Sequence, residues 1–279
     1  TSDRLDRRSR RDDGEYGRTV RGVWERPDAP VMAVTIKRVG PINNVHYPHD
    51  SFNRRLKREA TIWKAIDHPN ILQFLGYRAV RGALWLVTLW CQHGNLEQYI
   101  TSNPGLTAVR RVQMLCGAAR GLAHLHSLDP VIVHGTLQPK NVLVKDNLEV
   151  ALCDIGSSRV FSAVGHRIAS GYQAKEVLIS WTPTATTGDV YAFGGLILAT
   201  MSGKSPFWRK MTEPARIAAV CHDEIPLTKD HPLLPAADPL WNLLRECWSS
   251  EPEWRPTVEN VLQTLEREME KRLLPGNLP

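Results

Sequence analysis

Apolar and polar residues alternate in short runs through the first third of the chain. Residues 20–25 (VRGVWE) and 31–39 (VMAVTIKRV) show this alternation and are separated by the turn-like segment RPDAP. Two further strand-like runs follow at 72–80 (LQFLGYRAV) and 83–90 (ALWLVTLW). Before them, residues 51–66 place apolar side chains at helical spacing. The pattern predicts a small β-sheet accompanied by one helix.

Beyond residue 91 the apolar residues recur at helical spacing. Short strand-like runs interrupt the helical pattern only near 131–153. The predicted helices cover residues 107–127, 189–203, 239–248 and 257–273. The predicted fold class is therefore α+β: a β-rich lobe with one helix, followed by a mainly helical lobe.

The chain is predicted to divide into a basic, flexible leader (1–13), an N-terminal lobe (14–90), a C-terminal lobe (91–272) and a short tail (273–279). The net charge is +6, and residues 1–58 hold 14 Lys and Arg against 8 Asp and Glu. All of the positive excess is therefore N-terminal. The mixed signs and the lack of interleaved aromatic residues favour a solvated leader over a nucleic-acid-binding arm.

The composition is that of a soluble globular protein, with 42% hydrophobic and 23% charged residues. No apolar run approaches the length of a membrane span. The five cysteines are odd in number and lack close pairing, which gives neither a disulfide framework nor a zinc-binding pattern. A reducing, cytoplasmic setting is the expectation that follows.

Candidate chemistry begins in the N-terminal lobe. Gly14 and Gly17 would let main-chain amides approach a phosphate, although two such glycines also suit a plain hairpin turn. Lys37 ends a predicted strand, and Glu59 shares the apolar face of the next helix, where a carboxylate is costly without a partner. A Lys37–Glu59 ion pair would explain both residues; two exposed charges are the alternative.

A second set of candidates lies in the C-terminal lobe. Asn141 and Asp154 each adjoin a predicted short strand, and amide and carboxylate oxygens are the ligands that Mg²⁺ prefers. Asn and Asp are also common in ordinary turns. The order of a glycine-rich turn, a strand Lys, a helix Glu, a loop Asn and an Asp-x-Gly is more telling than any one residue.

With these motifs in order, the chain resembles a protein kinase domain, most closely the tyrosine-kinase-like branch, over residues 12–268. GEYG (14–17) resembles the second half of the glycine-rich loop, VTIK (34–37) the V-A-I-K strand, HGTLQPKN (134–141) the catalytic loop and DIG (154–156) the D-F-G motif. The resemblance implies a two-lobed kinase fold.

The same resemblance implies roles for several further residues. Thr88 stands at the gatekeeper position, and Leu89 to Cys91 correspond to the backbone that binds adenine. ATP would be bound by Gly14, Gly17, Lys37, Glu59, Thr88, Leu89, Cys91, Asn141 and Asp154, with Mg²⁺ held by Asn141 and Asp154. A Glu176–Arg255 ion pair is expected in the large lobe.

The catalytic loop departs from the kinase pattern at three nearby positions. Thr136 stands where the family has the aspartate that accepts the substrate proton, and Gln138 stands where Ser/Thr kinases keep a lysine near the transferred phosphate. Gly135 replaces the arginine that pairs with a phosphorylated activation loop. Each departure affects transfer or its control, whereas the nucleotide-binding set is retained.

The favoured interpretation is a pseudokinase that binds ATP and regulates or scaffolds protein partners, with weak or absent transfer. Two alternatives stay open. One is an active kinase, acting on Ser, Thr or Tyr, in which another group replaces the base. The other is an interaction module that binds no nucleotide, because a fold alone does not decide function.

Overall fold

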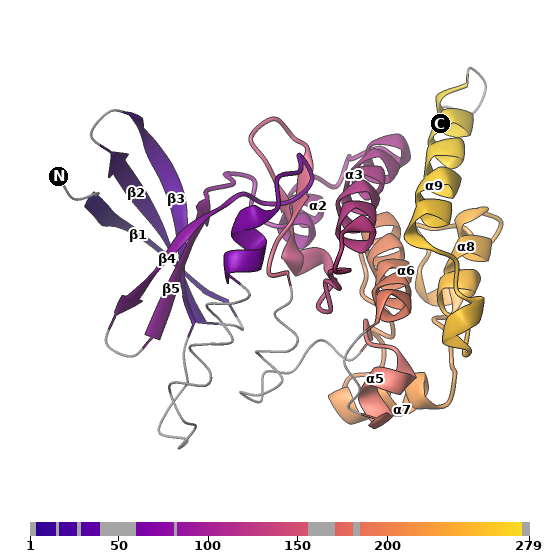
Figure 1. Cartoon of the computed structure of the whole chain (residues 1–279). Coiled ribbons are helices and arrows are strands. Elements are labelled where there is room, and N and C mark those ends of the chain that lie inside the picture. The colour runs from indigo at the N-terminus through magenta and orange to yellow at the C-terminus, as the bar shows by residue number, and fades with distance from the viewer. Residues whose placement is uncertain are drawn as a thin grey trace.

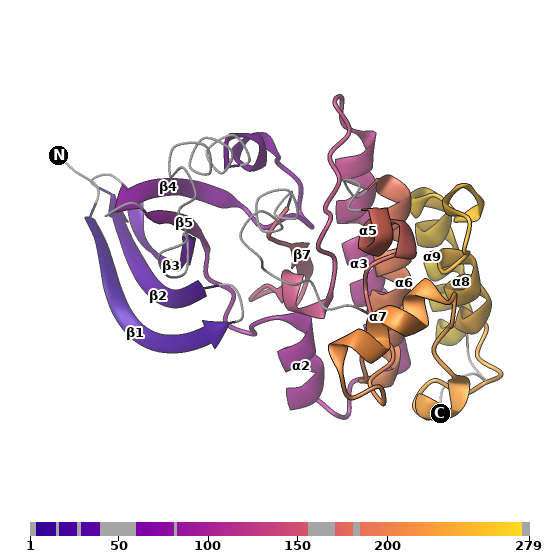
Figure 2. The ribbon, with the colours of Figure 1, turned by 90° about the horizontal axis from the view of Figure 1, so that it is seen from below.

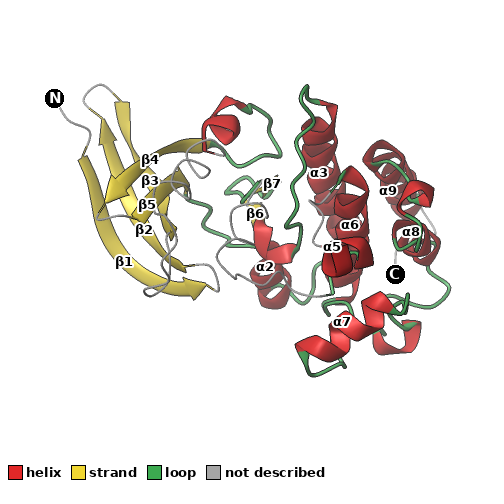
Figure 3. Ribbon diagram, turned by 60° about the horizontal axis from the view of Figure 1, so that its bottom comes forward, coloured by secondary structure: helices red, strands yellow, loops and turns green. Residues whose placement is uncertain are grey.

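The computed structural model shows a β-sheet lobe beside a helical lobe (Figure 1). Colouring by secondary structure separates the strands of one lobe from most helices of the other (Figure 3). The predicted two-lobed α+β architecture is thereby confirmed. The structure describes residues 4–14, 17–26, 29–39, 60–80, 83–155, 171–180 and 185–274.

The N-terminal lobe is an antiparallel sheet of five strands in the order β1-β2-β3-β5-β4. Seen from below, the sheet curves around one side of the molecule (Figure 2). The strands are β1 (Arg4–Gly14), β2 (Gly17–Arg26), β3 (Ala29–Val39), β4 (Phe74–Val80) and β5 (Ala83–Leu89). Residues 60–65 are helical; the earlier part of the helix predicted over 51–66 lies outside the described residues.

The N-terminal end of the chain differs from the sequence-based expectation of a flexible leader over 1–13. Arg4–Gly14 forms β1 and pairs with β2, with a register shift between Arg7 and Arg11. An edge strand needs only main-chain hydrogen bonds to its neighbour, so the apolar alternation used to predict strands is not required. Charged residues are a common composition of edge strands, because they discourage pairing with other chains.

The C-terminal lobe is built around long helices that the apolar periodicity predicted closely. Its short hairpin consists of β6 (Val142–Val144) and β7 (Val150–Leu152). The helices are α2 (Leu96–Ser102), α3 (Ala108–Ser127), α5 (Lys175–Ser180), α6 (Thr186–Ser202), α7 (Glu213–Cys221), α8 (Leu240–Cys247) and α9 (Val258–Leu273). In the part of the chain described here, no helix is both long and apolar enough to cross a membrane.

Local signals set the ends of these helices. The Thr107 side chain accepts a hydrogen bond from the Arg110 main-chain N–H and caps α3, and Thr257 caps α9 in the same way through Asn260. At the end of α6, Gly203 adopts a φ of 71°, a left-handed conformation that glycine takes without a steric penalty.

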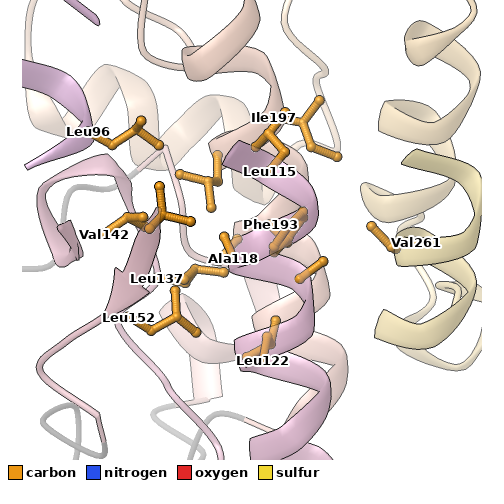
Figure 4. Close-up of a cluster of buried hydrophobic side chains, with 14 of the residues drawn as sticks. Leu96, Leu115, Ala118, Leu122, Leu137, Val142, Leu152, Phe193, Ile197 and Val261 are labelled. Carbon is orange, nitrogen blue, oxygen red and sulfur yellow. The ribbon is translucent and has the colours of Figure 1, made fainter. Parts of the chain in front are cut away.

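The core of the large lobe lies between α3, α6 and the β6–β7 hairpin (Figure 4). Leu115 and Leu122 of α3 and Phe193 and Ile197 of α6 are fully buried, as is Leu152 of β7. Burial of each such side chain contributes about 1.5–3 kcal/mol relative to exposure. This packing fixes the hairpin against α3 and so positions the loops on either side of it.

Candidate active site

Lys37 of β3 and Asp154, which follows β7, form an ion pair between the two lobes. Lys37 Nζ lies 2.5 Å from Asp154 Oδ2, and each side chain is 16% exposed. Asp154 adopts a φ of 61°, an uncommon conformation for a residue other than glycine. The expected Lys37–Glu59 pair cannot be compared with this contact, because Glu59 lies outside the described residues.

The loop before the hairpin is held by a buried carboxylate on α6. Asp189 is fully buried and accepts hydrogen bonds from the main-chain N–H groups of His134 (2.8 Å) and Gly135 (2.7 Å). His126 Nε2 lies 2.9 Å from the same carboxylate. Gly135 has a φ of 76°, which lets the chain turn sharply at this point. Asp189 is therefore a positioning residue for the loop.

His134 is buried beneath this loop as a neutral side chain. It has no exposed surface, and burial lowers the pKa of its imidazole below the usual range. The Thr136 main-chain N–H donates to His134 Nδ1 at 3.4 Å, so Nδ1 acts as an acceptor. A neutral, fully buried imidazole packed in this way supports the backbone and is not available to a substrate as an acid or base.

Thr136 occupies the centre of the loop and is only 5% exposed. Its hydroxyl donates to the main-chain oxygen of Asp154 at 3.3 Å, and its own carbonyl accepts from Asn141 Nδ2 at 2.7 Å. The Thr136 side chain is thus engaged in a hydrogen bond to the protein's own main chain. A neutral hydroxyl bound in this way offers no general base to an incoming substrate.

Asn141 and Asp154 suit the hard oxygen coordination of Mg²⁺. The Cys153 main-chain N–H donates to the Asn141 carbonyl at 2.9 Å, which brings Asn141 next to the start of the Asp-x-Gly motif. Since Asn141 Nδ2 is bonded to Thr136, its Oδ1 is the amide atom able to face a cation. With two protein oxygens, such an ion would take its other ligands from phosphate and water.

Gln138, which stands where Ser/Thr kinases keep a lysine near the transferred phosphate, lies inside the lobe. It is 3% exposed, and its Nε2 atom has no hydrogen-bond partner within the described part of the chain. A buried amide without a hydrogen-bond partner is destabilising unless a water molecule or a ligand accepts its hydrogen. The amide carries no charge and so replaces a lysine's attraction for phosphate with a weaker donor.

The segment that joins the lobes follows β5. Thr88 is 7% exposed and is the Cα partner of Thr35 on β3. The Trp90 main-chain N–H donates to Ala33 O at 3.2 Å, and the Cys91 carbonyl accepts from Gly94 at 3.2 Å. Burial raises the pKa of the Cys91 thiol to about 11, so the sulfur stays protonated near neutral pH.

The glycine-rich turn is the connection between β1 and β2. Gly14 and Gly17 are the last pair of partners in that antiparallel ladder. Two residues after Gly17 on β2, Thr19 is the Cα partner of Lys37 on β3. The turn thus extends from the same sheet that carries the lysine.

The expected Glu176–Arg255 ion pair is confirmed. Arg255 donates to both carboxylate oxygens of Glu176, at 2.6 and 3.1 Å, and its side chain is 1% exposed. The guanidinium also donates to the Ser249 and Thr187 carbonyls and lies 5.2 Å from the Tyr191 ring centroid. This pair fixes α5 against the rest of the helical lobe.

Two residues of the site were not singled out from the sequence. His126 and Asp189 meet across α3 and α6, 63 residues apart, and together hold the loop around His134. The only sequence signal was that DVYAFG (189–194) matches a large-lobe landmark of the kinase pattern. The role of its aspartate becomes visible only from the contacts.

Comparison with known proteins agrees with this geometry. The family model for protein tyrosine and serine/threonine kinases matches residues 8–265. The chain is 31% identical over 270 residues to a seven-transmembrane-domain-containing tyrosine-protein kinase of Dictyostelium discoideum, covering 91% of this chain and 37% of that protein. It is 28% identical over 265 residues to the human tyrosine-protein kinase FRK, covering 91% of this chain and 49% of that protein.

A dual specificity protein kinase of Dictyostelium discoideum, shkC, is 30% identical over 223 residues, covering 75% of this chain and 42% of that protein. The chain spans less than half the length of these relatives. The similarity therefore concerns one domain of larger proteins.

Proposed function

Because the chain belongs to the protein tyrosine and serine/threonine kinase family, we propose that it is a pseudokinase domain. It binds ATP with Mg²⁺ between its lobes, transfers phosphate weakly or not at all, and regulates or scaffolds protein partners. Its N-terminal lobe extends to residue 90 and its C-terminal lobe from 91 to 272, with a tail from 273.

One observation carries the proposal: Thr136, at the position of the catalytic base, is buried and donates its hydroxyl hydrogen to Asp154 O. Kinases use a carboxylate here to accept or orient the proton of the substrate hydroxyl. A threonine hydroxyl cannot take up that proton near neutral pH. General-base help is worth about 10²–10⁴-fold in rate, so its loss leaves transfer weak.

The nucleotide-binding residues support retention of ATP binding. Lys37 and Asp154 are in direct contact, and Gly14 and Gly17 end the paired strands that a phosphate would approach. The base would lie against Leu89 to Cys91 beside Thr88, and Asn141 and Asp154 would hold Mg²⁺. The ion supplies charge neutralisation of the phosphates when it is bound.

Binding of a nucleotide would act on the arrangement of the two lobes. Lys37 belongs to the sheet and Asp154 to the helical lobe, so a ligand that contacts both favours one relative position of the lobes. A protein partner that binds this arrangement of the lobes more tightly than others would then respond to ATP without any phosphoryl transfer. This is how a regulatory or scaffolding role follows from a nucleotide site alone.

The test is thermal unfolding of the purified chain during titration with ATP, with and without Mg²⁺. Ligand at 100 times its Kd stabilises the folded state by about 2.7 kcal/mol. We expect a Mg²⁺-dependent rise in Tm that is lost in Lys37→Ala and Asp154→Asn. No rise at millimolar ATP in the unmodified chain would reject nucleotide binding and leave the interaction module.

An active kinase is the second candidate, favoured by the retained Lys37–Asp154 contact and by Asn141 beside it. Phosphoryl transfer depends mainly on positioning and electrostatic stabilisation, so it can proceed without a base at a reduced rate. Transfer of phosphate that disappears in Asp154→Asn would establish this function. Transfer by a contaminating kinase would persist in that variant.

A further inference from the structure

The sheet presents two chemically different faces. Val34 and Ile36 of β3 are buried with Val87 of β5 in a small apolar cluster on one face. Side chains alternate along a strand, so Thr35 and Lys37 lie on the opposite face. Since Lys37 contacts Asp154 of the helical lobe, this second face is turned toward that lobe and forms the roof of the proposed nucleotide site.

A row of three polar residues crosses this roof. Arg21 of β2 is the Cα partner of Thr35, and Thr35 is the Cα partner of Thr88 on β5. Thr35 takes the place of the alanine in the V-A-I-K strand. In the neighbouring row, Thr19 replaces the apolar residue of the glycine-rich loop and pairs with Lys37. The roof therefore carries hydroxyl groups at two positions where the kinase pattern has hydrocarbon.

Two of these hydroxyls converge on one carbonyl. Thr35 Oγ1 donates to Leu89 O at 3.4 Å, and Thr88 Oγ1 donates to the same oxygen at 3.5 Å. A carbonyl oxygen has two lone pairs, so each of the two hydroxyls can occupy one of them. Both bonds are long and individually weak. They can exchange with a ligand, at a cost that the ligand must offset.

The two hydroxyls at Leu89 O matter for a purine base lying against residues 89–91. Adenine carries an amine donor at its 6-position and needs an acceptor there. Guanine instead carries an acceptor, O6, at that position, whereas N7 is an acceptor in both bases. A hydroxyl can rotate to donate to such an acceptor. The Arg21 guanidinium carbon lies 5.2 Å from the Trp90 ring centroid, which keeps further donors beside this segment.

We propose that Thr35 sets the base preference of the nucleotide site: its hydroxyl competes with the adenine amine for Leu89 O and admits a 6-oxopurine nucleotide such as GTP. The inference rests on the proposed function, because it requires a nucleotide whose base lies against residues 89–91. It goes further by assigning a specificity-determining role to a residue that the kinase pattern leaves apolar.

The test measures Kd for Mg-ATP and Mg-GTP by calorimetry in the unmodified chain, Thr35→Val and Thr35→Ser. Valine has the shape of threonine and the same strand preference, so the sheet is retained while the hydroxyl is removed. One hydrogen bond is worth about three- to tenfold in affinity. We expect Thr35→Val to bind ATP tighter by that factor without a gain for GTP, and Thr35→Ser to keep the original ratio.

Thr101→Val is the matched control, because the exposed Thr101 hydroxyl bonds to Glu97 O within α2 of the helical lobe. Equal ATP-to-GTP ratios in the unmodified chain and Thr35→Val would overturn this inference and leave ATP binding intact. Absence of binding by either nucleotide in the unmodified chain and in all variants would instead overturn the proposed function, and this inference with it.

Discussion

The hydroxyl of Thr136 donates a hydrogen bond to the main-chain oxygen of Asp154, 3.3 Å away. The residue at the base position is thereby tied to the residue proposed to hold Mg²⁺. The Thr136 carbonyl in turn accepts from Asn141 Nδ2, so three positions of the candidate site form one connected network. The loop keeps an ordered geometry although the group that would accept a proton is missing.

This geometry makes restoration of a base a direct test. We predict that Thr136→Asp raises phosphoryl transfer by about 10²–10⁴-fold, the contribution of a general base. The measurement is ADP release and phosphate incorporation into mixed Ser/Thr and Tyr peptide substrates. Activity of this kind must vanish when Asp154→Asn is added to the same chain.

Two results would count against the prediction. Thr136→Asp could bind ATP normally and still transfer no phosphate, in which case Gln138 or Gly135 also prevents transfer. Alternatively, the unmodified chain could already transfer at the rate of the variant, which would show that Thr136 is no impediment.

A second prediction concerns the buried ion pair of the helical lobe. Removing one partner of a buried pair leaves an uncompensated charge, at a cost of about 3–5 kcal/mol. We predict that Arg255→Met lowers the free energy of unfolding by up to that amount, because the Arg255 side chain is 1% exposed while the Glu176 side chain left behind is 29% exposed and partly solvated. Urea unfolding measures this change.

The exposed Arg120–Glu266 pair provides the control. Its N–O distance is 2.7 Å, similar to that of the buried pair, but its side chains are 47% and 37% exposed. Surface pairs contribute about 1 kcal/mol or less, so Arg120→Met is expected to change stability little. Equal losses in the two variants would show that burial is not what makes Arg255 important.

The fold was predictable where apolar periodicity is long. The helices expected over 107–127 and 257–273 correspond to α3 (Ala108–Ser127) and α9 (Val258–Leu273) within one residue at each end. Such helices bury one face against the core, and burial leaves a regular pattern in the sequence. Short or edge elements leave no comparable pattern, and β1 (Arg4–Gly14) was therefore missed.

The short helix α2 (Leu96–Ser102) was also missed, although a local signal was present. Asn95 accepts from the Gln98 main-chain N–H, and the Gln98 side chain accepts from Asn95 in return. This reciprocal capping box is readable as Asn-x-x-Gln before an apolar residue pattern. The capping box marks the start of a helix that is too short, at one or two turns, for apolar periodicity to reveal.

The candidate site was predictable as a set of residues and not as a set of contacts. Lys37 and Asp154 were both singled out, but their direct ion pair joins residues 117 positions apart. Likewise, the buried side chains of Thr136 and Gln138 follow from the packing of the loop on α6. Such contacts depend on how the lobes and helices pack, which residue spacing does not encode.

A third prediction tests the close approach of α3 to the main chain at Asn70, which precedes β4. A Cβ added at Gly121 would lie 2.5 Å from the Asn70 main-chain oxygen, which already accepts from Leu152 N at 2.9 Å. We predict that Gly121→Ala destabilises the fold by about 1–3 kcal/mol through overpacking, despite the higher helix propensity of alanine. Gly105→Ala is the control, because nothing lies within 4 Å of its added Cβ. A neutral Gly121→Ala would mean that α3 can shift away from Asn70.

The last prediction concerns His231, a buried imidazole outside the candidate site. The side chain is 1% exposed, its Nδ1 lies 2.9 Å from Ser202 Oγ, and its ring packs edge-on against Trp241. Burial lowers the pKa of His231 to about 4, although the neighbouring Asp230 acts in the opposite direction. In the unfolded chain the pKa is about 6.5.

Between these two pKa values the unfolded chain binds a proton that the folded chain does not. Stability from this group is therefore fully present above about pH 6.5 and is lost as the pH falls toward 4. We predict that the stability difference between the unmodified chain and His231→Gln shrinks from pH 7 to pH 5, as measured by urea unfolding. The same difference should stay constant from pH 7 to pH 8.5, where the imidazole is neutral in both states. A difference that does not change down to pH 5 would show that the folded protein accommodates the charged imidazole.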